Sequence, residues 1–369
     1  MRQAPVSADI TLADVVPSAA AALGITGYAS RCGFPEAAHV VVLLIDGLGF
    51  AALRAHDPAW LRSGALQRID SVVPTTTAVA LTSLGTGLLP GVHGMVGASF
   101  VLPDTDEVLA PLHWGGDPVP EAVQTEPTVF EAMARAGVVC SSLGPGTYAH
   151  SGLTRAALRG PTYVDVRSID EYVAAMSRVH ATSERSFTYV YWPELDRVGH
   201  EFGVASHEWE SALDRVGVLV DTLTEGLPHD SALALTADHG MVDCPVPGRI
   251  LWDDLGDLHA GVRAITGEPR YRLIYLDPEC DAPSVAARWQ ARLGPDFDVW
   301  ERTDLVASGV IGPVEPFAAD RLGDLVVVAN GDRMLSCPTV DPRISSLPGQ
   351  HGGWTEAERG IPLVVWRRG

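Results

Sequence analysis

The chain has 369 residues, of which 46% are hydrophobic and 20% charged, as is usual for a folded globular protein, and no apolar run approaches the roughly 20 residues that span a membrane. Its formal net charge of −20 would repel nucleic-acid backbones and anionic membranes, so neither a nucleic-acid polymer nor a membrane is expected as a partner. All 26 basic residues are arginines, which excludes any mechanism that requires a lysine.

The N-terminal stretch does not resemble a signal peptide, because Asp9 and Asp14 interrupt the apolar residues that such a segment keeps together. The five cysteines are widely spaced and contain no C-x-x-C pair, so they indicate reduced, mostly buried thiols and not a zinc knuckle or redox site. We therefore expect a cytoplasmic protein.

Short β-branched runs alternate with amphipathic stretches along the chain. The runs, at 39–46, 137–144, 186–192, 231–238, 324–330 and 361–366, suit a parallel sheet covered on both faces. Helices are predicted at 127–137 and 206–225. This alternation predicts an α/β fold with a doubly wound, mostly parallel central sheet and helices on both faces.

Between about 245 and 320 the pattern loosens into segments punctuated by proline and glycine, with a short strand at 271–277 and a helix near 284–293. We interpret 245–320 as a small inserted α+β subdomain. Residues 1–244 and 321–369 would then form the catalytic α/β core.

Acidic and histidine residues follow several of the predicted strands, where ligands of open parallel sheets gather. Asp46 ends the first run, Asp196 follows the run at 186–192, and Asp238 and His239 end the run at 231–238. Each one alone is more often a helix cap or a turn residue. Their recurrence favours a binding site.

Two further histidines extend this set. His200 lies four residues after Asp196, one helical turn, so that both side chains could reach a single ion, although a surface pair would have the same spacing. His351 lies in the glycine-rich segment GQHGGW, where it could equally be a loop histidine. Three carboxylates and three imidazoles suit zinc, manganese or related divalent ions.

The segment PTTTAVALTSLGTG (74–87) supplies hydroxyl groups immediately before an apolar helical pattern. A threonine at that helix start would have free backbone N–H groups and the positive end of the helix dipole beside it, which suits a phosphoryl oxygen. An ordinary N-cap threonine is the alternative.

The order D-G-L-G, P-T-T-T, D-x-x-G-H, T-A-D-H-G-M and H-G-G resembles the alkaline phosphatase superfamily, and within it the nucleotide pyrophosphatase/phosphodiesterase family, over about residues 39–354. The resemblance implies an alkaline-phosphatase-like fold and a metal-dependent hydrolase of phosphate esters, most of all phosphodiester or pyrophosphate bonds. The implied partner is a small-molecule phosphate ester.

The resemblance also implies a role for each matching residue. Thr77 would be the nucleophile, with Thr76 and Thr75 as near alternatives. One divalent ion, zinc or manganese, would be held by Asp46, Asp238, His239 and the Thr77 hydroxyl, and a second by Asp196, His200 and His351. Metal coordination would lower the pKa of the Thr77 hydroxyl, and in-line displacement would pass through a covalent phospho-threonine.

Substrate contacts match the family less well. Ala80 stands where the family usually has a phosphate-binding asparagine, so a hydroxyl such as that of Thr76, a backbone N–H or an arginine would have to replace it. Trp114 resembles a family residue near the leaving group, but could be a core aromatic. Tyr148 and His150 follow a strand and are weaker candidates for substrate contacts.

Other functions of the superfamily fit less well. A sulfatase needs a C/S-x-P-x-R motif, which is absent, and a cofactor-independent phosphoglycerate mutase has a different serine motif and a longer chain. Phosphonoacetate hydrolases bind their substrate with lysines, and this chain has none. A phosphomonoesterase stays open, because the same metals and Thr77 could act on either ester; an arginine directed at the metals would favour it. A non-catalytic relative or a structural metal protein is disfavoured by the complete ligand set.

Overall fold

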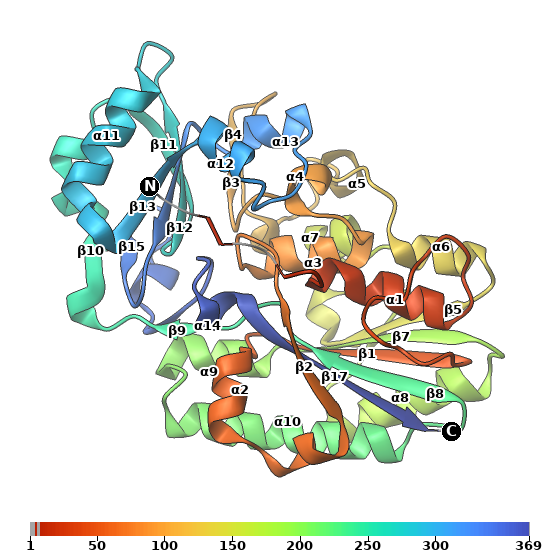
Figure 1. Cartoon of the computed structure of the whole chain (residues 1–369). Coiled ribbons are helices and arrows are strands. Elements are labelled where there is room, and N and C mark those ends of the chain that lie inside the picture. Colours follow the sequence, from red (N-terminus) through yellow and green to blue (C-terminus); the bar gives the residue numbers. More distant parts are fainter. Residues whose placement is uncertain (1–3, 6–7, 369) are drawn as a thin grey trace.

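The computed structural model describes residues 4–5 and 8–368; the other residues of the expected core lie outside it. A seven-stranded sheet forms one half of the molecule, and a smaller four-stranded sheet lies in the other half (Figure 1). The large sheet has the order β2 (Ala65–Asp70), β17 (Gly360–Arg368), β8 (Ser231–Thr236), β1 (His39–Ile45), β7 (Ser186–Trp192), β5 (Val139–Gly144) and β6 (Thr162–Asp165).

Strands β1, β5, β6, β7 and β8 run parallel, and β17 is antiparallel to both of its neighbours. The predicted α/β fold with a mostly parallel sheet is confirmed. The parallel direction expected for 361–366 is wrong, because this last strand enters the sheet from the opposite end.

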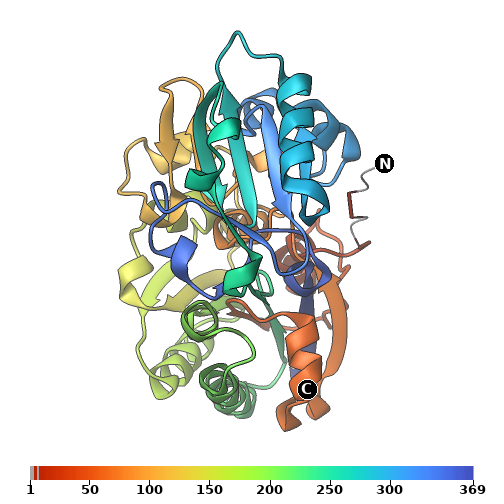
Figure 2. The ribbon, with the colours of Figure 1, turned by 90° about the vertical axis from the view of Figure 1, so that its left-hand side faces the viewer.

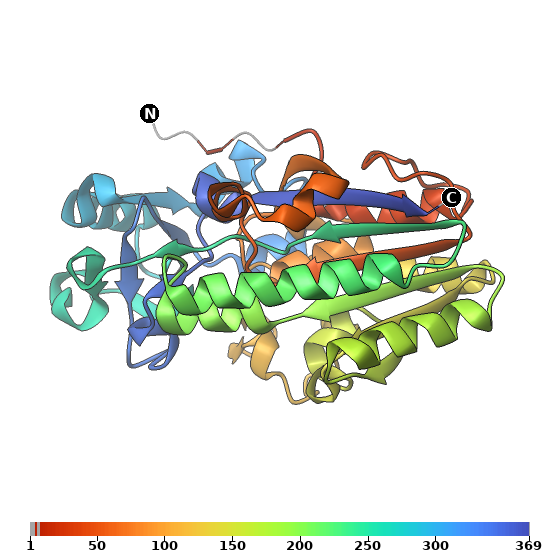
Figure 3. The ribbon, with the colours of Figure 1, turned by 90° about the horizontal axis from the view of Figure 1, so that it is seen from below.

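Helices cover both faces of this sheet. One face carries α1 (Val15–Ala22), α3 (Thr77–Thr86), α6 (Val129–Arg135) and α7 (Gly152–Ala157). The other carries α8 (Ile169–Ala181), α9 (Glu194–Phe202) and α10 (His207–Glu225), as the view from below shows (Figure 3). Strands β1 and β8 are almost wholly buried between these layers, which explains their unbroken apolar sequences.

The smaller sheet is antiparallel and has the order β11 (Val262–Glu268), β12 (Tyr271–Leu276), β14 (Leu325–Ala329) and β13 (Phe297–Glu301). Helix α11 (Ala282–Leu293) packs on it through Val285 and Trp289 and closes a second apolar core (Figure 2). The strand at 325–329 was expected in the large sheet and lies in this one. The boundary expected at 320 therefore falls before the smaller sheet is complete.

The described chain also contains shorter helices and strands. They are α2 (Phe50–His56), α4 (Pro90–His93), β3 (Phe100–Leu102), β4 (Glu107–Leu109), α5 (Pro120–Val123), β9 (Val242–Asp243), β10 (Arg249–Leu251), α12 (Arg302–Ser308), α13 (Pro316–Arg321), β15 (Met334–Ser336), β16 (Gly349–Gln350) and α14 (Glu356–Arg359). Among the described residues, no helix combines the length and the apolar character needed to cross a bilayer.

A buried histidine joins α4 to α3. The amide of Met95 donates to Nδ1 of His93 (3.1 Å), so the ring proton lies on Nε2 and is donated to the Ser83 hydroxyl (2.8 Å). Burial, together with the charge of Arg321, lowers the pKa of His93 to about 3. The imidazole is therefore neutral in the folded protein.

Acid should destabilise the protein through His93. In the unfolded chain, His93 is protonated near its ordinary pKa of about 6.5, whereas in the folded protein it is protonated only near pH 3. The contribution of His93 to the free energy of unfolding is therefore complete above pH 6.5 and is lost as the pH falls toward 3. Over that range His93 contributes a slope of about 1.4 kcal/mol per pH unit. Urea unfolding at pH 8, 6 and 5 should show a shallower pH dependence for His93→Gln than for the wild type. The exposed His207→Gln is the control, and parallel curves for His93→Gln and the wild type would contradict the prediction.

Candidate metal centre

The carboxyl ends of β1, β7 and β8 meet at one edge of the large sheet and carry the predicted ligands. Asp46 directly follows β1, and Asp238 and His239 follow β8. Helix α9 begins two residues after β7 and places Asp196 and His200 one turn apart. Residues that are distant in the sequence thus converge because parallel neighbouring strands end together.

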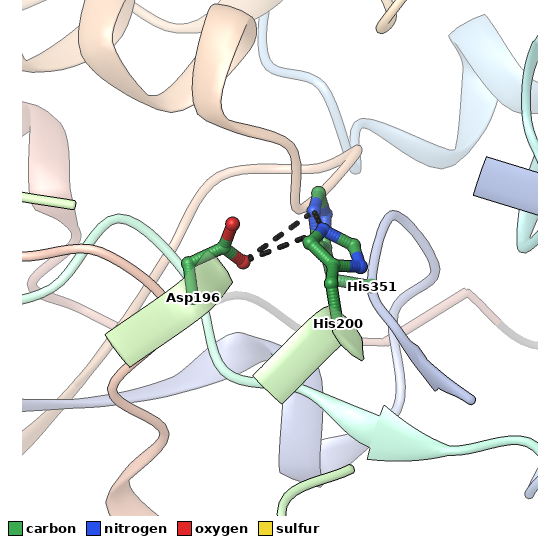
Figure 4. Close-up of side chains that lie close together, drawn as sticks. All are labelled: Asp196, His200 and His351. Atoms are coloured by element: carbon green, nitrogen blue, oxygen red, sulfur yellow. Dashed lines mark hydrogen bonds and ion pairs between the residues drawn. The ribbon is translucent and has the colours of Figure 1, made fainter. Parts of the chain in front are cut away.

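Two overlapping groups of these side chains have ligand atoms within 4.8 Å of one another. One contains Asp196, His200 and His351, which point toward one another (Figure 4). The other contains Asp46, Asp196 and His239. Asp196 belongs to both groups, although the resemblance assigned it only to the ion at His351.

Asp238 completes the second group. Its Oδ2 lies 3.4 Å from Nε2 of His239, while its Oδ1 accepts the amides of Gly47 (3.1 Å) and His239 (3.0 Å). Nε2 of His239 is also 3.6 Å from Oδ1 of Asp46. One carboxylate oxygen of Asp238 is thus held by the backbone, and the other faces the cluster.

Three carboxylate oxygens at the centre of this cluster are buried and lack a hydrogen-bond partner within the described structure: Oδ1 of Asp46, Oδ1 of Asp196 and Oδ2 of Asp238. Buried carboxylate oxygens without partners are costly unless a cation compensates them. A set of aspartate oxygens and imidazole nitrogens suits zinc or manganese. The side chains therefore fit divalent ions.

The electrostatics agree with this fit. Burial, and then the charges of Asp238 and Asp196, raise the pKa of Asp46 well above its usual value. Burial likewise raises the pKa of Asp238. The pKa of His351 lies well below its usual value because of burial and of the neighbouring imidazoles of His239 and His200. The crowded, buried carboxyls therefore resist carrying their negative charges together, and a bound cation would be needed to keep them ionised, whereas the His351 imidazole is already in the neutral form that binds a metal.

The three threonines at the start of α3 have different surroundings. Oγ1 of Thr77, the first residue of the helix, lies 3.2 Å from Nε2 of His239. Thr75 is engaged elsewhere: its hydroxyl donates to the carbonyl of Gly353 (2.7 Å) and accepts the amide of Gly352 (3.2 Å). The Thr76 hydroxyl is buried beside the carboxyl of Glu268, toward which it can donate, and makes no hydrogen bond of ordinary geometry among the described residues.

The loop that carries His351 is held against the threonine segment 75–77 by a short antiparallel bridge between Thr75 and Gly352. Nδ1 of His351 faces the carbonyl of Thr75 (3.0 Å), which leaves Nε2 directed at Nε2 of His200 (3.1 Å). The ring of His351 also stacks on that of His239, with centroids 3.8 Å apart. The glycine-rich segment is therefore fixed by long-range contacts.

The structure brings all seven proposed ligand and nucleophile residues together but does not bring Trp114 to them. The Trp114 indole is 6% exposed, packs on Gly152 and donates to the carbonyl of Pro118 (2.8 Å). This is the environment of a core aromatic, as the alternative interpretation held. Ala80 is wholly buried inside α3 and has no polar side-chain atom to offer a phosphate.

Sequence reasoning missed two residues beside the cluster. The hydroxyl of Tyr191, at the end of β7, donates to Oδ2 of Asp46, and burial followed by the Asp46 charge raises the pKa of this phenol. Glu268, at the end of β11, lies 3.5 Å from Nδ1 of His351. Tyr191 was detectable as a polar residue at a strand's carboxyl end, whereas no local pattern distinguishes Glu268.

Comparisons with known proteins agree with this geometry. The family model for type I phosphodiesterase/nucleotide pyrophosphatase matches residues 40–352. No curated protein matches the chain in sequence.

Similar solved structures share the fold at low identity. Murine ectonucleotide pyrophosphatase/phosphodiesterase 5, solved as an inactive threonine-to-alanine form in complex with AMP, is 20% identical, covers 88% of this chain over 87% of its own and has a TM-score of 0.68. Phosphonoacetate hydrolase from Sinorhizobium meliloti, in complex with phosphonoformate, is 22% identical, with coverages of 90% and 91% and a TM-score of 0.69.

The match of the family model extends over most of the chain, from β1 to the His351 loop, and includes every strand end that carries a ligand. The chain therefore belongs to the type I phosphodiesterase/nucleotide pyrophosphatase family of phosphoric ester hydrolases, divalent-metal-dependent enzymes of the alkaline phosphatase superfamily.

Proposed function

We propose that this enzyme hydrolyses phosphodiester or pyrophosphate bonds of a small molecule, with Thr77 as the nucleophile and two divalent ions, most suitably zinc, as cofactors. The observation that carries the proposal is the position of the Thr77 hydroxyl, 3.2 Å from His239, beside three unpaired carboxylate oxygens. The inactive threonine-to-alanine form of the similar murine protein supports a threonine nucleophile here.

Asp46, Asp238, His239 and the Thr77 oxygen would hold one ion, and Asp196, His200 and His351 the other; Asp196 also lies within reach of Asp46 and His239. The ions would supply Lewis acidity and lower the pKa of the Thr77 hydroxyl. Thr77 would then attack phosphorus in line with the departing oxygen, form a phospho-threonine and release the alcohol or phosphate; water would cleave this ester in a second displacement.

Residues of this chain would orient the reaction. The backbone N–H groups of Thr77 and Ala78 at the start of α3, together with the positive end of its dipole, would bind a phosphoryl oxygen at Thr77 and take the place of the family's asparagine. Tyr191 would hold the Asp46 carboxylate through its hydroxyl. The Thr76 hydroxyl, buried in the same turn, is a further candidate donor to the phosphate.

A cavity of about 840 Å³ suits the leaving group. It opens beyond the carboxyl ends of β5, β6 and β7, next to the start of α9, and is lined by aromatic side chains such as Tyr163, Tyr172 and Trp192 together with His150. Tyr148 packs edge-on against Tyr191, between this cavity and Asp46. An aromatic lining beside the centre supports an ester with a bulky organic group over inorganic pyrophosphate.

A diester is favoured over a monoester by the placement of the arginines. Monoester enzymes usually add a cation to meet the extra phosphate charge. In the described part of the chain, no arginine forms an ion pair with Asp46, Asp196 or Asp238, and the arginine that lines the cavity, Arg167, pairs with Asp165.

The test is a comparison of initial hydrolysis rates. Chelator-stripped enzyme, reloaded with zinc or manganese, should cleave bis-p-nitrophenyl phosphate and a p-nitrophenyl nucleotide ester faster than p-nitrophenyl phosphate, and the stripped enzyme should cleave none of them. Preference for the monoester would replace the proposal by a phosphatase. Faster cleavage of a phosphonate than of any ester would assign the chain to phosphonate hydrolysis.

A further inference from the structure

The hairpin between β11 and β12 extends the smaller sheet to the metal centre. Gly267, the last residue but one of β11, has a φ of +83°, and a Cβ there would lie 2.2 Å from the carbonyl oxygen of Tyr271, so only glycine fits. Glu268 follows and is 6% exposed. The turn therefore directs a carboxyl group out of the smaller sheet and into the interface with the His351 loop.

Glu268 lies on the side of the His351 ring that faces away from the other ligands. Its Oε2 is 3.5 Å from Nδ1 of His351, whereas Nε2 of the same ring lies 3.1 Å from Nε2 of His200 and 3.9 Å from Oδ1 of Asp196. The ring is thus held between Glu268 and the carbonyl of Thr75 on one side and the ligand cluster on the other.

The carboxyl group of Glu268 is tightly packed against the His351 loop. A Cβ on Gly352, the residue after His351, would lie 2.5 Å from Cδ and Oε1 of Glu268. Oε1 itself is buried and makes no hydrogen bond of ordinary geometry among the described residues, and the hydroxyl of Thr76 is the donor beside this carboxyl. A carboxyl that is buried with an unpaired oxygen destabilises the protein unless it serves another purpose.

A second contact fixes the hairpin to the same loop. Arg270 and Glu358 form a wholly buried ion pair, with Nε and Oε1 2.6 Å apart, and Glu358 accepts the amide of Gly353 (2.9 Å). Because this pair already anchors the hairpin, Glu268 is not needed as an anchor. The polar neighbours of its carboxyl are Nδ1 of His351 and the hydroxyl of Thr76.

We propose that Glu268 is a positioning residue, contributed by the smaller sheet, that orients the His351 ring so that Nε2 faces Asp196 and His200 and so strengthens ion binding at that group. Carboxylates behind metal-binding imidazoles fix ring orientation and increase ligand basicity. The inference rests on the proposed role of His351 as a metal ligand, and it makes the smaller sheet part of the metal centre.

Glu268→Gln tests it, because the substitution keeps the shape and removes the carboxylate. Titration of chelator-stripped protein with Co²⁺, followed by visible absorbance and calorimetry without substrate, should show one ion bound about 10- to 100-fold more weakly and the other unchanged. Glu356→Gln is the matched control, since this glutamate begins α14, just after the His351 loop, and is exposed and paired with Arg68; the variant should bind both ions as the wild type does.

A double-mutant cycle separates positioning from a general structural role. If Glu268 acts through His351, Glu268→Gln should have no further effect on ion affinity in a His351→Ala background. The unfolding midpoint of the metal-free Glu268→Gln protein should equal or exceed that of the wild type. The proposal would be overturned if Glu268→Gln bound both ions more weakly by the same factor and had a lower unfolding midpoint. Unchanged affinities for both ions would also overturn it. If Glu268→Gln does not fold, the same titrations of Glu268→Asp, which retracts the carboxylate, decide in the same way.

The readout is independent of turnover. A wild-type protein that binds two ions and hydrolyses no phosphate ester would refute the proposed function and leave this inference standing. A Glu268→Gln protein that binds both ions and cleaves diesters as the wild type does would refute only the inference.

Discussion

Replacement of Thr77 by alanine is expected to lower kcat for a diester by roughly 10⁴-fold or more, because it removes the attacking oxygen. The fold should be retained, since Thr77 is the first residue of α3 and its hydroxyl contacts the imidazole of His239 and no backbone group among the described residues. The ion at Asp196, His200 and His351 should bind as before, because the hydroxyl does not belong to that group. Single-turnover hydrolysis and metal content per chain measure the two effects.

The neighbouring threonines supply the controls. Thr77→Ser keeps the hydroxyl and should retain turnover, whereas Thr75→Ala should mainly reduce stability, by about 1 kcal/mol for each hydrogen bond lost to Gly353 and Gly352. Thr76→Ala should keep the nucleophile and change phosphate binding at most. Turnover by Thr77→Ala, combined with its loss in Thr76→Ala, would move the nucleophile to Thr76.

Most of the centre could be predicted from the sequence because its geometry follows from topology. In a parallel sheet, strand ends that carry Asp46 and Asp238 must meet wherever the strands are neighbours, and β1 and β8 are neighbours in register. Asp196 and His200 needed only the helical repeat of α9. His351 was different, since its place depends on the long-range bridge between Thr75 and Gly352, and only the family motif indicated it.

The sequence did not predict which sheet a strand joins, or which residues meet across the interface between the two sheets. Buried apolar runs look alike in parallel and antiparallel strands, so neither the antiparallel direction of β17 nor the place of β14 in the smaller sheet was predictable. Glu268 could not be found either, because it meets His351 through the packing of two sheets, between residues 83 positions apart in the chain (351 − 268).

Replacement of Asp238 by asparagine is expected to abolish turnover while it stabilises the metal-free protein. Asparagine can keep the oxygen that accepts the amides of Gly47 and His239, and it replaces the unpaired Oδ2 by an uncharged group. Relief of a buried, uncompensated carboxylate should raise the free energy of unfolding of the metal-free protein by about 1–3 kcal/mol. The same change removes a negative ligand from the ion at Asp46 and His239, so ion binding there and turnover should be lost.

The decisive comparison is with a buried aspartate that already has cationic partners. Asp70 is 2% exposed and pairs with Arg68 and Arg359, each at 2.7 Å, so Asp70→Asn should lower stability by on the order of 1–3 kcal/mol and leave ion binding intact. Thermal unfolding of both variants with and without chelator, together with metal content, should therefore give opposite signs for the metal-free proteins. Because addition of metal stabilises a protein that binds it, the wild type and Asp70→Asn should gain stability with zinc by more than Asp238→Asn does. Asp238 would instead be a structural carboxylate if Asp238→Asn destabilised the metal-free protein and left ion binding unchanged. The remaining ligand candidates, Asp46, Asp196, His200, His239 and His351, would then hold the ions without it.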